Sequence, residues 1–201
     1  MDGKDFTIII PAHNSAGFIE KALSSIRAQE YDRQSYELIV VCDACTDNTK
    51  EVAEKYADRV IFTDYGRDGL ARQAGIDQAA GNWILFMDDD DWWLHEYVLA
   101  TLAPFCLIDA DIVCFGFIWR KVGNIRQKAG RIFPNVWSKM YRRDFLTRSG
   151  VRFDDTRMAS DLVFNRKILT ELPAMKFIDQ PLYYYNYMRP GSQTEVESRE
   201  S

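Results

Sequence analysis

Three short apolar runs, each followed by polar residues, constrain the fold of this 201-residue chain more than any other feature. The runs cover residues 6–10, 38–41 and 83–87. Apolar runs of this length, without polar alternation, predict strands that are buried on both faces, as in a parallel sheet. Pro11 follows the first run, and we expect the first strand to stop there.

Segments with helical periodicity separate these runs. Apolar residues recur at helical spacing between residues 18 and 26. A second helix is expected from a cap at Thr46 or Asp47 to about residue 56, followed by a short strand at 60–62. A third helix, from about residue 70 to 80, should end at Gly81. This alternation predicts a doubly wound α/β fold with a mostly parallel sheet, in which ligands bind outside the carboxyl ends of the strands.

The pattern is less regular beyond residue 91. We expect a helix through about residue 102, a strand over 112–119 that turns at Gly123 and Asn124, and a late strand over 181–188. A helix over 160–172 should turn inward the side chains of Leu162, Val163, Ile168 and Leu169. Since there is no interdomain linker, we predict one compact domain over residues 1–192 and a polar tail over 193–201.

Four consecutive aspartates, residues 88–91, follow the third apolar run directly. Adjacent carboxylates repel one another, so a fold that gathers them at a strand end is expected to supply a cation. Mn²⁺ or Mg²⁺ would fit, because hard divalent ions commonly bind through one or two carboxylates plus substrate phosphates. In an extended segment, Asp88 and Asp90 would share one side, and Asp89 and Asp91 the other. An acidic run alone is more often a solvated loop, but the buried strand before it favours a site.

Other polar residues also follow strands. Asp43 comes after the second strand, so it should reach the same edge as Asp88 and could bind a ligand, although aspartate is also common in simple turns. His13 follows the first strand, where a packing or hydrogen-bonding role is the better interpretation, although a ligand could reach it. Cys42 and Cys45 have the spacing of a redox pair or half a zinc site, but no matching second pair exists, so packing is the better interpretation.

The charge is distributed unevenly along the chain. Residues 1–118 hold 9 basic and 21 acidic residues, whereas residues 119–152 hold 10 basic and 1 acidic residue. This basic band could meet phosphate, an anionic membrane surface or nucleic acid, or could be a solvated surface. No apolar run approaches the ~20 residues that cross a bilayer, and the start lacks the pattern of a secretory signal, so we predict a cytoplasmic protein.

Five motifs, in order, carry a family resemblance: PAHNSAGFI, VVCDACTDNT, GLARQAGIDQAAGNWILFMDDDDWW, WSKMYRRDFL and SDLVFNR. Together they resemble the family 2 glycosyltransferases with the A-type nucleotide-diphospho-sugar transferase fold, over residues 8 to about 194. The resemblance implies transfer of a sugar from a nucleotide-diphosphate donor to an acceptor hydroxyl, with inversion. It also divides the chain into a nucleotide-sugar-binding half, 1–91, and an acceptor-side half, 92–192.

The same resemblance assigns roles to individual residues. It places Asp90 and Asp88 on the metal, Mn²⁺ or Mg²⁺, and makes Asp161 the catalytic base that deprotonates the acceptor. The donor-binding residues that it implies are Pro11, Ala12, His13, Asp43, Arg72, Asp88 and Asp89.

Two departures bear on these roles. Ser160 stands where the family usually has a glutamate before the base, and Cys42 stands where an acid is frequent. The lost carboxylate could have raised the pKa of its neighbour or positioned the acceptor. Two alternatives stay open: a sugar-nucleotide binding module without turnover, which Ser160 and a shorter stretch than usual between Trp93 and Pro134 suggest, and a thiol redox protein that uses Cys42 and Cys45.

The resemblance further implies a uridine diphosphate sugar as donor, with guanosine or thymidine donors still open. The acceptor would be a glycan or a lipid-linked molecule in surface polysaccharide or glycan synthesis, and nucleic acid is not expected as a partner. The basic band at 120–152 could receive an anionic acceptor or touch the inner face of the membrane, and a homo-oligomer is possible.

Overall fold

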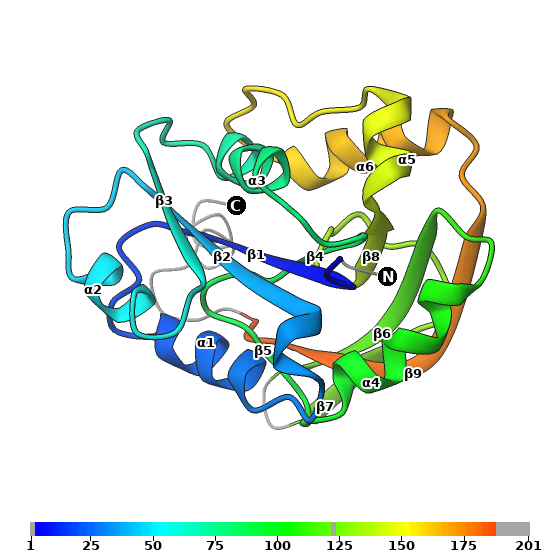
Figure 1. The fold of residues 1–201 in the computed structure, drawn as a ribbon, viewed down its shortest axis with the longest axis horizontal. Helices are drawn as coiled ribbons and strands as arrows, with labels where there is room; N and C mark the ends of the chain where they lie inside the picture. Colours follow the sequence, from blue (N-terminus) through cyan, green and yellow to red (C-terminus); the bar gives the residue numbers. More distant parts are fainter. Residues whose placement is uncertain (1–2, 122–123, 188–201) are drawn as a thin grey trace.

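Within residues 3–121 and 124–187, which the computed structural model describes, nine strands form one sheet with helices on both faces (Figure 1). The strands are β1 (Phe6–Ala12), β2 (Tyr36–Asp43), β3 (Arg59–Thr63), β4 (Trp83–Phe86), β5 (Trp92–Trp93), β6 (Ile112–Lys121), β7 (Asn124–Lys128), β8 (Lys139–Arg142) and β9 (Met175–Tyr185). The α-helices are α1 (Ile19–Arg27), α2 (Thr49–Ala53), α3 (Asp68–Asp77), α4 (Val98–Leu102), α5 (Arg143–Ser149) and α6 (Ser160–Thr170). Short 3₁₀ helices cover Arg33–Ser35 and Ala103–Leu107.

The strand order is β3-β2-β1-β4-β8-β6-β9-β5, and β7 pairs with β6. Strands β3, β2, β1 and β4 are parallel, as the apolar runs predict. Antiparallel pairs enter with β8, which joins β4 to β6 and so continues the sheet into the second half of the chain. The predicted doubly wound α/β fold is confirmed, and one continuous sheet unites both halves.

Two apolar cores, one on each face of the sheet, explain why the strands lack polar alternation. Ile8 and Ile10 point into the core that α1 and α4 cover. Ile9, between them, points into the core that contains residues of α3, α5 and α6. Figure 1 shows these two groups of helices on opposite sides of the sheet. Successive side chains of a strand face opposite sides, so each of these strands is buried on both faces.

The first strand runs through Pro11 to Ala12, so the expectation that Pro11 ends it is wrong. Pro11 pairs with Val41 of β2, whereas β4 ends opposite Ile9. Beyond that point, β1 has a neighbouring strand on one side only. The missing N–H of proline therefore costs no bond to β4.

Several predicted boundaries also move. The predicted second and third helices are present as α2 and α3, but both end earlier than expected. The helix expected after residue 91 begins only at Val98, because Trp92 and Trp93 form β5 against β9. The late strand begins at Met175 rather than at residue 181.

The predicted helix over 160–172 is confirmed as α6, but its inward face is not the predicted one. Of the side chains expected to face inward, Ile168 is buried, Leu162 and Val163 are only half-buried, and Leu169 is exposed. The other buried residues of α6 are Ser160, Phe164 and Asn165. The helix therefore directs two polar side chains toward the interior, beside the site described below.

Some predictions fall outside the described residues. Residue Gly123 of the predicted turn and the whole polar tail at 193–201 lie there, and the domain boundary at residue 192 stays a prediction. In the segments that are described, no helix is both long enough and apolar enough to span a bilayer.

Candidate functional site

The four aspartates lie at the carboxyl end of β4, but they do not form an extended segment. The backbone N–H of Asp91 donates to the Asp88 carbonyl at 3.2 Å, which closes a turn, so the expected strand-like alternation is wrong. Asp91 is fully buried and accepts hydrogen bonds from the Tyr183 hydroxyl at 2.6 Å and the Asn186 N–H at 2.8 Å. Asp88, Asp89 and Asp90 remain half-buried at the sheet edge.

Arg72, on α3, connects this edge to the second half of the chain. Its guanidinium is almost fully buried and donates to Asp88 Oδ1 at 2.6 Å. The same group lies 3.4 Å from Asp161 Oδ1 and also bonds Asp68, four residues earlier on α3. The fold thus brings the predicted metal ligand, Asp88, and the predicted base, Asp161, to one arginine.

Carboxylates outnumber cations at this edge, and their pKa values reflect it. Burial raises the pKa of Asp88 to about 7, with Arg72 opposing the shift and the charges of Asp161 and Asp90 adding to it. Burial and the neighbouring charges of Asp90 and Asp88 likewise raise the pKa of Asp89 to about 7. Burial holds the pKa of Asp91 well above its ordinary value. A bound cation would relieve this excess of negative charge.

The residues at this edge fit a divalent cation that is held partly by protein carboxylates and partly by the phosphates of a bound substrate. No cluster of three or more His, Cys, Asp or Glu side chains suited to a metal occurs within the described parts of the chain. Asp88 accepts from Arg72 at Oδ1 and lines a cavity of about 560 Å³, and Asp90 lies in the turn that follows it. One or two carboxylates plus phosphate oxygens are a common coordination for Mg²⁺.

Asp43 is placed at the same edge, as predicted, but its carboxylate also organises the chain before α3. Its two oxygens accept from the Thr63 hydroxyl at 2.9 Å and from the N–H groups of Tyr65 at 2.7 Å and Arg67 at 2.8 Å. The side chain is only 4% exposed. An ionised carboxylate offers about four acceptor positions, so one is left for a ligand donor.

The chain after β1 contributes the rest of the donor-side residues. Pro11 and Ala12 end the strand and are buried, whereas His13 is exposed. The His13 ring Nδ1 lies 2.7 Å from the Asp43 carbonyl, and its backbone N–H donates to Asp89 at 3.3 Å. Asn14, in the left-handed conformation at φ 49°, accepts from the Thr46 N–H at 2.8 Å. These contacts join the ends of β1 and β2 to the aspartates.

Asp161 lies in the first turn of α6 and borders a cavity of about 560 Å³. Its Oδ2 accepts from the Val136 N–H at 2.9 Å, while its buried Oδ1 has no hydrogen-bond donor among the described residues. Asp88 borders the same cavity. The aromatic residues of its wall are Phe117, Trp119, Phe133, Trp137, Tyr185 and Tyr187. All the residues that line the cavity, except Asp88, come from the predicted acceptor-side half.

Although Ser160 stands where a glutamate is usual, the structure places another carboxylate beside it. The Ser160 hydroxyl donates to Asp68 Oδ2 at 2.8 Å, and Asp68 also pairs with Arg72. Gly69 favours this approach, because a Cβ at that position would lie 3.0 Å from the Ser160 Cβ, a tight contact. Sequence reasoning missed Asp68, because the third helix was predicted to begin only at about residue 70, whereas α3 begins at Asp68; an acid four residues before Arg72 was a usable signal.

The structure argues against the thiol redox alternative. Cys42 is 1% exposed, and burial raises the pKa of its thiol to about 12. Reactive cysteines instead have lowered pKa values and access to solvent. Packing accounts for Cys42, as the sequence suggested.

The described side chains of the basic band at 120–152 do not form one continuous surface. Lys139 is buried, while Arg142 and Arg143 donate to backbone carbonyls. Arg148 and Arg152 form ion pairs with aspartates. Arg126, Lys128 and Arg131 are exposed, and Lys128 lines the cavity. The closely spaced basic residues in the sequence therefore overestimate the positive charge that is exposed to a partner.

Comparison with solved structures defines the class as an A-type glycosyltransferase fold. The Staphylococcus aureus TarS 1–349 complex with UDP-GlcNAc has a TM-score of 0.82 and 25% identity, over 95% of this chain and 60% of that one. The mannosyltransferase PcManGT from Pyrobaculum calidifontis, in complex with GDP-Man and Mn²⁺, has a TM-score of 0.73 and 17% identity, over 98% and 64%.

Residues 7–171 match the model of glycosyl transferase family 2, and the chain belongs to that family. The uncharacterized glycosyltransferase EpsJ of Bacillus subtilis is 31% identical over 220 residues, which cover 94% of this chain and 63% of EpsJ. The poly(ribitol-phosphate) beta-N-acetylglucosaminyltransferase TarS of S. aureus is 27% identical over 209 residues, covering 92% of this chain and 36% of TarS. The chain therefore spans only part of the length of these relatives.

Proposed function

We propose that this chain is a metal-dependent, inverting glycosyltransferase that moves a sugar from a nucleotide-diphosphate donor to an acceptor hydroxyl. The observation that carries the proposal is the contact of one buried arginine, Arg72, with both Asp88 and Asp161 at a shared cavity. Such a site can hold a leaving diphosphate beside Asp88 and an attacking hydroxyl beside Asp161.

The donor is a uridine diphosphate sugar on this proposal, supported by likeness to a TarS structure that contains UDP-GlcNAc. Asp90 and Asp88 hold Mn²⁺ or Mg²⁺, which when bound neutralises charge that develops on the diphosphate. The donor-binding residues are Pro11, Ala12, His13, Asp43, Arg72, Asp88 and Asp89.

Asp161 acts as the catalytic base. Its Oδ2 accepts from the Val136 N–H and its Oδ1 lies 3.4 Å from Arg72, so the carboxylate is held in place with acceptor capacity left for the proton of an acceptor hydroxyl. The hydroxyl oxygen forms a bond to the anomeric carbon as the bond to the diphosphate breaks. Attack from the side opposite the leaving group inverts that carbon.

The acceptor is a glycan or a lipid-linked molecule that enters the aromatic-walled cavity, in the synthesis of a surface polysaccharide or glycan. Aromatic faces suit the apolar faces of sugar rings, and exposed Lys128 at the cavity suits an anionic acceptor. Peripheral membrane contact at 120–152 would use the exposed residues of β7, at the cytoplasmic face of the membrane. A homo-oligomer is compatible with this arrangement, and no nucleic acid partner is proposed.

A screen of nucleotide sugars, with and without Mn²⁺, tests the proposal by thermal shift and by nucleotide release. The correct donor should raise the melting temperature only with the ion, because a ligand that binds the folded state stabilises it. Nucleotide should then be released on turnover. Binding without release, in the presence of candidate acceptors, would select the non-catalytic binding module. No metal-dependent binding of any nucleotide sugar would refute the proposed function.

A further inference from the structure

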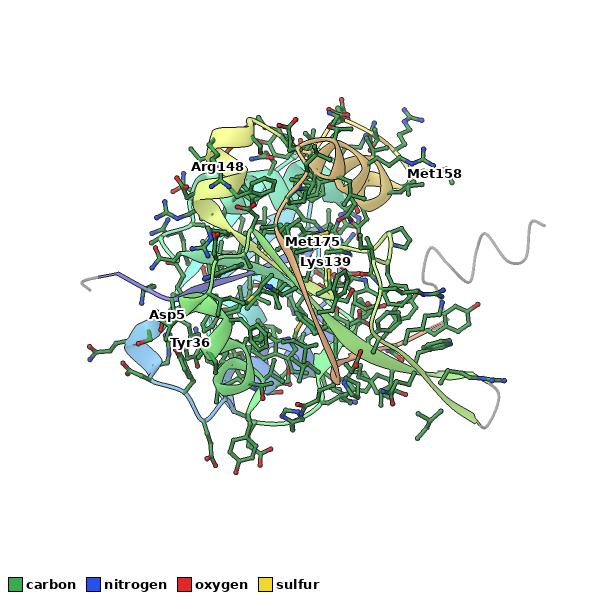
Figure 2. The ribbon with its side chains drawn as sticks, turned by 90° about the vertical axis from the view of Figure 1, so that its right-hand side faces the viewer. Asp5, Tyr36, Lys139, Arg148, Met158 and Met175 are labelled. Carbon is green, nitrogen blue, oxygen red and sulfur yellow. The ribbon has the colours of Figure 1, made fainter. Side chains whose placement is uncertain are left out.

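Lys139 is a buried lysine in the middle of the sheet. It begins β8 and is 1% exposed, and Figure 2 shows it near the middle of the molecule while Arg148 and Met158 lie at the periphery. No carboxylate of the described residues forms an ion pair with it, although lysine is seldom fully buried without one. A methionine would fill this volume at less cost, so the ammonium group calls for an explanation.

The ammonium group holds the backbone of the segment just before it. Lys139 Nζ donates to the Phe133 carbonyl at 2.7 Å and also to the Asn135 carbonyl. Asn165, a buried residue of α6, donates from Nδ2 to the Pro134 carbonyl at 2.7 Å and to the Asn135 carbonyl at 3.2 Å. Three successive carbonyls of an irregular segment are thus satisfied by two buried donors. Without those donors the segment would lose these hydrogen bonds, and the Phe133 carbonyl, whose bond is buried, would be left unpaired in the interior.

The next backbone group after these carbonyls reaches the candidate base. The Val136 N–H donates to Asp161 Oδ2 at 2.9 Å, and Asn165 also donates to the Asp161 carbonyl at 2.9 Å. Phe133, Pro134 and Asn135 line the cavity that Asp161 borders. The direction of the Asp161 carboxylate therefore depends on how the 133–136 segment is held.

We propose that Lys139 is a positioning residue: its ammonium group fixes the 133–136 segment so that the Val136 N–H orients Asp161 and the segment forms one wall of the acceptor cavity. This inference rests on the proposed role of Asp161 as the base. Lys139 itself touches neither donor nor acceptor.

Electrostatics give Lys139 a second link to the base. Burial lowers the pKa of Lys139 to about 8, while electrostatic interaction with Cys114 and Asp161 opposes the shift. Near neutral pH the side chain is therefore cationic, and the Asp161 carboxylate is among the charges that keep it so. An uncharged replacement would remove both the hydrogen bonds and this interaction.

Amide hydrogen exchange, measured on the ligand-free protein, tests the inference without knowledge of the substrates. In Lys139→Met, the amides of Phe133 and of residues 135–137 (Pro134 has none) should exchange about tenfold faster or more, because two bonds that anchor the segment are lost, while β1, β2 and the middle of α6 keep their protection. Ile168→Val is the matched control: it trims the core on the same side of the sheet but removes no hydrogen bond to the segment, and should leave the exchange of these amides unchanged. Unchanged exchange at 133–137 in Lys139→Met would overturn the inference, as would equal acceleration throughout the sheet.

A kinetic double-mutant cycle separates positioning from general damage. With UDP-N-acetylglucosamine and Mn²⁺ as the probe, Lys139→Met should lower nucleotide release about tenfold and leave donor affinity within about twofold, since it acts through Asp161. In an Asp161→Asn background, Lys139→Met should cause no further loss. A full additional loss there would contradict the inference. Release at the normal rate by Asp161→Asn would instead refute the proposed function, whereas normal release by Lys139→Met alone would refute only the inference.

Discussion

Replacing Arg72 with methionine is the sharpest test of the electrostatics of the site. The Arg72 side chain is 5% exposed and pairs with Asp68, Asp88 and Asp161. Methionine fills a similar volume but leaves three carboxylates without their shared cation. The variant should therefore lose stability mainly through charge, with little change in packing.

The expected loss of stability in Arg72→Met depends on how deeply its three carboxylate partners are buried. Removing one member of a buried ion pair typically costs about 3–5 kcal/mol. The three carboxylates retain 46%, 28% and 21% exposure, so water can screen part of the stranded charge. We therefore expect the low end, about 3 kcal/mol, which lowers the melting temperature of a chain of this size by about 6–12 °C.

The assay is thermal and urea unfolding near pH 8 in a buffer with a metal chelator. Arg152→Met is the matched control, because Arg152 pairs with Asp77 at the surface, where such pairs contribute about 1 kcal/mol or less. Adding Asp88→Asn to Arg72→Met should recover part of the lost stability. The reasoning is refuted if Arg72→Met is no less stable than Arg152→Met.

Three further predictions concern the acidic edge. The folded-state pKa of Asp88 is raised to about 7, so protonation stabilises the ligand-free protein as pH falls through that value, and Mn²⁺ must displace the proton to bind. The Mn²⁺-induced rise in melting temperature should therefore be larger near pH 8 than near pH 6, and should be lost in Asp88→Asn. Tyr183→Phe removes a hydrogen bond from buried Asp91, so urea unfolding should reveal a loss of about 1–3 kcal/mol; unchanged stability would contradict this. Gly81→Ala should strongly lower the melting temperature, because the added Cβ would lie 2.4 Å from the backbone of β1. Gly17→Ala, which has open space around it, should be near neutral, and similar melting temperatures of the two variants would argue against this packing.

The sequence predicted the parallel half of the fold because its signals are local. The runs at β1, β2 and β4 are continuous and apolar, and each is followed by polar residues that the doubly wound topology brings to one edge. The placement of Asp43 beside the aspartates followed from that rule alone. Short strands such as β5 and β8 have no periodicity of their own and were missed, since tertiary pairing defines them.

The second half of the site depends on long-range packing that no local pattern encodes. Asp161 reaches Arg72 because β8 and α5 carry the chain back across the sheet before α6 begins. The face of α6 was mispredicted because apolar residues occur all around the helix, so periodicity gave Leu162 and Leu169 no less weight than Phe164. Asn165 and Lys139 are polar and buried, and composition gives no sign that their donors satisfy the 133–136 carbonyls.

The claim that Asp161 acts as the base while other residues bind the donor is tested most directly by a calorimetric and kinetic comparison of Asp161→Asn with the unchanged protein. With the donor found in the nucleotide-sugar screen and Mn²⁺, the variant should bind the donor with unchanged affinity but transfer sugar about 10²–10⁴-fold more slowly, the range that general base catalysis contributes. Transfer at an undiminished rate would contradict the account, because the proton of the acceptor would then leave by another route.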